Sequence, residues 1–200
     1  MRKAFAPLSL VLAAALLLPG CGAREDKPDI PRLLAELRGP DPQKSGEARL
    51  KLLQIGEPAA PALAELLRSG TPADRIAAAN TLWGMGPRGR AAVPELAAAL
   101  SDPDPELRNA AAMACQTMGA TAAAAVPELT KAISDRDSRV RQAAVKALAA
   151  IGPPAMSALP ALTRVLRRGS WPEAEEAVRR IRGLADDAPI ELGPESPEQP

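Results

Sequence analysis

The 200-residue sequence has no histidine and no tyrosine, and its single phenylalanine is Phe5. Histidine is the commonest general base and the commonest transition-metal ligand in proteins, so acid–base catalysis and metal binding lose their usual residue. The sequence also has no glycine-rich phosphate loop and no paired-cysteine metal motif. These absences predict a protein that is not an enzyme and that binds no cofactor and no metal.

The sequence carries little net charge. Its 25 basic and 24 acidic residues give a formal charge of +1, and the balance stays close to neutral if the N-terminal Arg2 and Lys3 are removed by processing. A nucleic-acid-binding domain normally shows a basic excess gathered on one face. We therefore expect no nucleic-acid partner.

Residues 1–20 have the composition of an export signal. Arg2 and Lys3 precede an apolar run over residues 8–18, which is too short to cross a bilayer comfortably as a transmembrane helix. The closing residues 18–21, LPGC, resemble the lipobox of bacterial lipoproteins, in which the cysteine becomes the first mature residue and carries lipid. The alternative is an ordinary cleaved signal peptide with an incidental cysteine. We expect cleavage before Cys21 and lipidation of Cys21.

This resemblance implies a place in the cell. The mature chain would be anchored by lipid to a bacterial membrane, facing the periplasm or the exterior. Gly22 rather than Asp follows the cysteine, which in Gram-negative lipoproteins implies the outer membrane. Residues 21–29 would form a polar tether, and residues 185–200, which are acidic and rich in proline, would form a disordered tail.

The central part of the chain repeats at a fixed interval of 33 residues. One set of positions shows it clearly: Pro61, Pro94, Pro127 and Pro160. A second set closes the units: Gly86, Gly119 and Gly152. A period of this size is typical of stacked units that cannot bury their apolar faces alone.

Each unit reads as a helical hairpin. The repeated proline suits the first turn of a first helix, because its missing N–H would have no partner there. A second helix should begin after four good N-cap residues at the same interval and end at the glycine, in a left-handed conformation. These N-cap residues are Thr71, Asp104, Asp137 and Ser170.

Residues 101–119 and 134–152 carry an Asp in the turn, an Arg six residues later, an Ala-rich second helix and a closing Gly. This pattern resembles HEAT repeats, in the short form called HEAT-like or PBS-lyase-type. The resemblance implies an all-α fold, a right-handed α-solenoid of about five hairpins over residues 30–184. The fifth hairpin would be a polar cap, in which Arg180 aligns with the small residue Ala147.

In this family the repeated Asp and Arg form a structural ladder between neighbouring units. Carried over, the ladder would contain Arg75, Asp102, Arg108, Asp135 and Arg141, with Ser69 in place of the first Asp. The alternative is that these charges grip an anionic partner. Cys115 aligns with Leu82 and Leu148, which favours a small buried hydrophobe over a reactive thiol.

Function should lie where the units differ. Three variable positions on each second helix are spaced i, i+4 and i+7, so they share one face, and the family resemblance directs this face into the concave groove. The stripe is apolar near its N-terminal end and polar near its C-terminal end, and Trp83 could be a partner anchor or part of the core. The candidate partner-binding residues are Leu50, Leu53, Ile76, Asn80, Trp83, Met113, Gln116 and Lys146.

Two functions remain open at this point. The first is a non-catalytic, membrane-anchored scaffold or adaptor that binds a protein or peptide on its concave face. The second is an enzyme or enzyme-associated subunit, implied by the resemblance of these units to repeats in phycobilin lyases. The variable stripe contains no converging cluster of acids, which favours the adaptor.

Overall fold

The computed structural model describes residues 28–185 and 187–192, and within them it contains helices and no strand. Ten α-helices in this part of the chain form five consecutive hairpins, which confirms the all-α repeat fold and the number of units. The first helices of the hairpins are α1 (Ile30–Leu37), α3 (Ala60–Ser69), α5 (Val93–Ala99), α7 (Val126–Ala132) and α9 (Leu159–Arg168). The second helices are α2 (Pro42–Ile55), α4 (Pro72–Met85), α6 (Pro105–Met118), α8 (Ser138–Ile151) and α10 (Pro172–Arg182).

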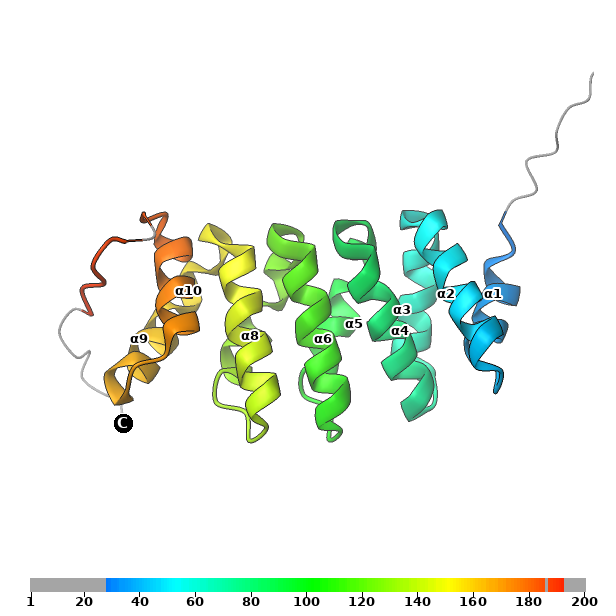
Figure 1. The fold of residues 1–200 in the computed structure, drawn as a ribbon, viewed down its shortest axis with the longest axis horizontal. Helices are drawn as coiled ribbons and strands as arrows, with labels where there is room; N and C mark the ends of the chain where they lie inside the picture. The colour runs from blue at the N-terminus through cyan, green and yellow to red at the C-terminus, as the bar shows by residue number, and fades with distance from the viewer. Residues whose placement is uncertain (1–27, 186, 193–200) are drawn as a thin grey trace, which may run out of the picture.

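The hairpins stack in a single row, with the second helices side by side in one layer and the first helices behind them (Figure 1). The helices α4 and α6, α6 and α8, and α8 and α10 form extensive contacts across this layer. The surface formed by α2, α4, α6, α8 and α10 is called the second-helix face below. Every unit contributes one helix to this face.

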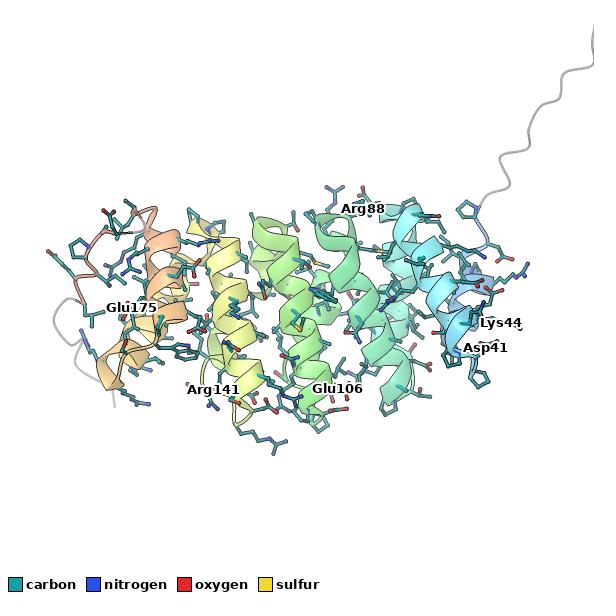
Figure 2. All side chains as sticks on the ribbon, in the orientation of Figure 1. Asp41, Lys44, Arg88, Glu106, Arg141 and Glu175 are labelled. Atoms are coloured by element: carbon teal, nitrogen blue, oxygen red, sulfur yellow. The ribbon has the colours of Figure 1, made fainter. Side chains whose placement is uncertain are left out.

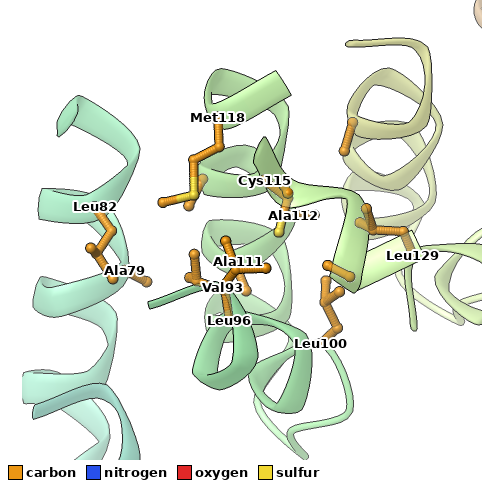
Figure 3. Close-up of a cluster of buried hydrophobic side chains, with 14 of the residues drawn as sticks. Ala79, Leu82, Val93, Leu96, Leu100, Ala111, Ala112, Cys115, Met118 and Leu129 are labelled. Atoms are coloured by element: carbon orange, nitrogen blue, oxygen red, sulfur yellow. The ribbon is translucent and has the colours of Figure 1, made fainter. Parts of the chain in front are cut away.

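Small residues allow the second helices to approach one another closely. Ala111 and Ala114 of α6 are completely buried, as are Leu82 of α4 and Leu96 of α5. Figure 3 shows this apolar cluster, in which side chains from consecutive hairpins meet. Each fully buried leucine contributes about 1.5–3 kcal/mol. The buried residues of the five hairpins form one cluster, so the core continues from unit to unit without a domain boundary.

Cys115 belongs to this core. Its side chain is completely buried, and removal from water raises the pKa of its thiol to about 12. The thiol therefore stays protonated at neutral pH, which confirms the prediction of a small buried hydrophobe.

Short 3₁₀ helices connect the hairpins, and the repeat pattern did not predict them. They are η1 (Glu57–Ala59), η2 (Gly86–Ala92), η3 (Gly119–Ala125) and η4 (Pro153–Ala158). Gly119, which ends α6, has φ 57° and ψ −136°. Its φ is positive as expected, but its ψ is far from that of a left-handed helix, so the prediction of a left-handed cap is wrong in ψ. This conformation is almost confined to glycine, and it turns the chain directly into the linker.

Three of the four predicted N-caps are present. The Asp104 carboxylate accepts from the backbone N–H of Glu106 at 2.8 Å, and that of Asp137 accepts from Arg139 at the same distance. Thr71 forms a capping box with Asp74.

The fourth N-cap prediction, Ser170, is wrong. Trp171 occupies the N-cap of α10 and makes no side-chain cap bond, and Pro172 is the first helical residue. Proline fixes the backbone for a helix start and disfavours helical geometry in the residue before it, so α10 begins one residue later than the 33-residue period predicts.

This shift corrects the alignment of the last unit. Ile181, which is buried, takes the position of Ala147, whereas Arg180 is exposed to solvent. The buried face of α10 consists of Ala174, Ala177, Val178 and Ile181. The polar outer surface expected of a cap is present, although through a different register.

Residues 187–192 contain no helix, but they contact the last unit. Arg179 Nε donates to the carbonyl of Ala188 at 3.1 Å, and Arg167 Nη2 donates to that of Leu192 at 2.6 Å. These bonds tie the first part of the expected tail to α9 and α10. The expected signal segment, Cys21 and residues 193–200 lie outside the described residues.

Candidate functional site

The ladder residues join neighbouring hairpins. Arg75 Nη1 lies 2.7 Å from Asp102 Oδ2 of the next unit. Arg108 binds Asp135 through two parallel bonds, from Nε to Oδ2 and from Nη2 to Oδ1, both at 2.8 Å. Two-point binding of this kind is the strongest form of the arginine–carboxylate pair. Both contacts cross from one hairpin to the next, as stacking requires.

The two members of the Arg108–Asp135 pair differ in burial, since Asp135 is partly exposed and the pair lines a hollow of about 450 Å³. Arg108 is only 4% exposed, and its hydrogen bonds hold the pKa of Asp135 below its usual value despite partial burial. Arg108 Nη1 also donates to the carbonyls of Asp102 and Pro103. The carboxylates of Asp102 and Asp135 thus occupy the guanidinium groups that the alternative hypothesis assigned to an anionic partner.

Arg141 differs from the two preceding arginines. Its Nη1 donates to the carbonyl oxygens of Asp135, at 2.9 Å, and Arg136, at 3.2 Å. No carboxylate pairs with Arg141 among the residues that the structure describes. The ladder therefore stops at this interface.

The apolar residues of the variable stripe fall into two groups. Leu50 and Trp83 are exposed, at 58% and 43%, which excludes a core position for Trp83. Leu53, Ile76 and Met113 are half-buried and pack against the core. The stripe is thus an apolar floor from which two large side chains protrude.

The backbone around Trp83 is held firmly. Its carbonyl accepts from Thr117 Oγ1 of α6 at 2.9 Å. The next residue, Gly84, faces Leu53 of α2, whose Cδ2 would lie 3.0 Å from an added Cβ. On α6, Asn109 Nδ2 donates to Met113 Sδ at 3.5 Å. Trp83 consequently stands on the second-helix face between α2 and α6, next to backbone that contacts both of these helices.

The polar part of the stripe lies further along the same face. Asn80 and Gln116 are half-buried, and Lys146 on α8 is exposed. Gln142, one turn before Lys146, donates from Nε2 to Glu173 Oε1 at 2.8 Å. This arrangement places hydrogen-bonding groups beside the apolar floor, as in the rim of a protein interface.

Besides the hollow at Arg108 and Asp135, two others were not predicted from the sequence. One, of about 550 Å³, lies between α1 and α2 and is lined by Leu33, Ile55 and polar residues. The other, of about 380 Å³, lies between the start of α8 and Trp171. The sequence signal for the second hollow is Arg168, which stands where the preceding unit has Asp135. This signal becomes informative only once Asp135 is known to bind Arg108.

The described residues contain no group of three His, Cys, Asp or Glu side chains placed to hold a metal ion. Over residues 28–185 and 187–192, no helix has the length and apolar character needed to span a membrane.

The stacked hairpins and their charged ladder define an α-solenoid repeat protein. A family model for HEAT repeats matches residues 60–126 and 93–182, more than half of the sequence. The chain therefore belongs to the HEAT-repeat family.

A search of curated proteins finds no match to the chain. Among solved structures, a designed armadillo repeat protein in complex with the peptide (KR)4 is similar, with TM-score 0.57 and 21% identity over 76% of this chain and 81% of that one. A second is the complex of CpcE and CpcF of phycocyanin lyase from Nostoc sp. PCC7120, with TM-score 0.59 and 21% identity over 76% of this chain and 97% of that one. At these identities the likeness shows the fold alone.

Proposed function

We propose that this chain is a non-catalytic adaptor that binds a peptide or protein partner on its second-helix face. The observation that carries the proposal is Trp83, a large side chain that is 43% exposed on a floor of half-buried apolar residues. Tryptophan is strongly favoured at the energetic centres of interfaces, because it buries a large area at small entropic cost. Leu50 would add a second anchor on the neighbouring α2.

The fold supports a binding role. Repeat solenoids present one long surface to which every unit adds side chains, and the similar designed armadillo protein is in complex with a peptide. CpcE and CpcF, the similar lyase proteins, form a complex with each other. A lyase-like role is the second candidate, and it rests on this likeness of fold.

The proposal includes attachment to a membrane. Lipid on Cys21 would hold the adaptor at the envelope of its bacterial host, at the outer membrane if the host is Gram-negative. More than one acyl chain would be required, since a single chain gives only marginal binding. Replacing Cys21 by serine should move the protein from the membrane fraction to the soluble fraction; unchanged membrane association would contradict lipid anchoring at this residue.

The test of the binding surface is a pull-down from detergent-solubilised membranes of the native host, with bound proteins identified by mass spectrometry. Wild type is compared with Trp83→Ala and with Met156→Ala, which removes an exposed apolar side chain on η4. We expect a stoichiometric partner with wild type and Met156→Ala that is lost with Trp83→Ala. Circular dichroism should show that both variants are folded.

Equal recovery of every partner with the two variants would place the binding surface elsewhere. A bound chromophore or measurable turnover in the purified protein would favour the lyase-like alternative instead. In that case the second-helix face would have to be examined as a substrate site.

A further inference from the structure

Arg141 presents the same guanidinium geometry as Arg108 but lacks its carboxylate. In both residues Nη1 donates to two backbone carbonyls of the preceding turn. In Arg108 the opposite edge, formed by Nε and Nη2, binds Asp135 at two points. We call the same edge of Arg141 the open edge, because no described residue accepts a hydrogen bond from it.

The missing carboxylate follows from the last unit's sequence. Aligning α9 with α7 puts Arg168 where Asp135 stands in the unit before. The helix α9 also continues to Arg168, whereas α7 ends at Ala132. The acidic turn of the central units is therefore replaced by a basic helix end, and none of the residues that the structure describes supplies a ladder acid at this point.

Arg141 lies near the N-terminal end of α8 (Figure 2), and a hollow of about 380 Å³ lies beside it. Its lining contains no acidic side chain and consists of Ser138, Arg139, Arg141, Gln142 and Trp171. Two of the polar groups already have partners, since Arg139 pairs with Asp137 at 3.1 Å and Gln142 donates to Glu173. The open edge of Arg141 is the strong donor left for a ligand, and the half-buried Trp171 gives the hollow an apolar wall.

We propose that Arg141 and Trp171 form a binding site for a carboxylate of an acidic peptide segment, which takes the position that Asp135 takes at Arg108. The evidence for this site is the comparison of Arg141 with Arg108, and it is independent of the proposed binding surface around Trp83. A planar guanidinium edge matches a carboxylate through two parallel hydrogen bonds. The acidic peptide has two possible sources, a partner protein or the chain's own residues 193–200, which include Glu195 and Glu198.

The chain's own segment is a reasonable source because of where the described chain ends. The carbonyl of Leu192 accepts from Arg167, next to the residue that replaces the ladder acid. Eight extended residues can reach about 25 Å. The experiment must therefore separate this source from an external one.

Trp171 provides a direct signal, because the chain has only two tryptophans. In a Trp83→Phe background, Trp171 emission is followed while an acetylated, amidated tetra-aspartate peptide is added to the detergent-solubilised chain. We expect a saturable change with this peptide and none with the matched tetra-asparagine peptide. Arg141→Gln should weaken binding by about tenfold or more, as expected for charge-assisted bonds, whereas Arg49→Gln, an exposed charge on α2, should leave it unchanged.

A second arm uses a chain that ends at residue 192, which keeps every helix. Tighter peptide binding to this shorter chain would identify residues 193–200 as the resident ligand, and equal binding would indicate an external acidic partner. Arg141→Lys, which keeps the charge but not the planar edge, should also bind more weakly. The proposal is overturned if neither chain length gives a saturable change, or if Arg141→Gln and Arg141→Lys, both folded by circular dichroism, bind the peptide as well as the parent.

Discussion

The interface between α6 and α8 and the interface between α8 and α10 are built from the same repeat, but they use its charges differently. Between α6 and α8, the nearly buried Arg108 binds Asp135 at two points. Between α8 and α10, Arg141 keeps its backbone contacts and has no carboxylate partner in the described chain. Apolar packing of Ala174, Ala177 and Val178 of α10 continues without the ion pair.

This difference separates two roles of the ladder. A ladder acid is not required to stack α10 on α8, because that interface forms from small and apolar residues together with the hydrogen bond from Gln142 to Glu173. The charge pair adds a fixed register between central units. Removing one member of the pair is strongly destabilising, because the other charge is left without its partner. At the end of the array the same arginine is released from this duty, which is why it can serve as a ligand site.

The largest effect should come from breaking the central pair. Arg108→Ala removes the two-point partner of Asp135 and leaves that carboxylate only the backbone N–H of Asp137, so it should lower the free energy of unfolding by about 3 kcal/mol. Arg141→Ala loses only bonds to exposed or partly exposed carbonyls and should cost about 1 kcal/mol. Urea denaturation followed by circular dichroism measures both values.

A double variant provides the control. Arg108→Ala combined with Asp135→Ala removes both charges and should recover part of the loss seen with Arg108→Ala alone. If the two single arginine variants are equally stable, the proposed difference between the interfaces is wrong.

The glycines that end the second helices should show a smaller contrast of the same kind. Gly119→Ala places a side chain at φ 57° and ψ −136°, a conformation that costs about 1–3 kcal/mol for residues other than glycine. Gly183, after α10, has φ 66° and ψ 31°, so alanine there should cost only about 1 kcal/mol. Thermal melting of both variants tests this, and a larger loss at Gly183 would contradict it.

The repeat period predicted the third and fourth units well, because the turns within these two units have the same length, as do η2 and η3, which precede them. It failed at the α9–α10 connection, where Pro172 sets the helix start and Ser170 loses its capping role. The 3₁₀ linkers were missed for a different reason. Residues 119–125 are rich in alanine and have no hydrophobic period of their own, so the sequence does not indicate a helix there. In the structure, the chain turns at Gly119, where φ is positive.

The candidate surface could be predicted only in outline. Helical spacing placed Ile76 and Trp83 on one face, but it could not distinguish their exposure. Ile76 packs against the core, whereas Trp83 is 43% exposed. This difference depends on the neighbouring helices, which the spacing within one helix does not show. Likewise, the open edge of Arg141 depends on the geometry of two interfaces, which a single repeat cannot reveal.

Helix capping gives the next contrast in order of size. Asp104→Ala removes a cap that accepts from Glu106, at a cost of about 1 kcal/mol. Ser170→Ala should change stability by no more than a few tenths of a kcal/mol, because the N-cap of α10 is Trp171. Equal losses in urea denaturation would indicate that Ser170 caps α10 after all.

The smallest effect should appear in acid, and it again distinguishes the two interfaces. Hydrogen bonds from Arg108 hold the pKa of Asp135 below its ordinary value of 3.8, so the unfolded chain takes up a proton at higher pH than the folded chain does. The stabilisation is therefore fully present above about pH 4 and is lost as the pH falls through the depressed folded value.

Unfolding free energies of wild type, Arg108→Gln and Arg141→Gln, measured between pH 7 and pH 3, test this assignment. The wild-type and Arg108→Gln values should converge as the pH falls. Protonation of Asp135 removes the stabilising ion pair from wild type, and the substitution has already removed that pair at neutral pH. The Arg141→Gln curve should stay parallel to wild type if the open edge holds no carboxylate. Convergence of that curve as well would mean that residues 193–200 already occupy Arg141, which would join the last interface to the ladder through a carboxylate from outside the repeats.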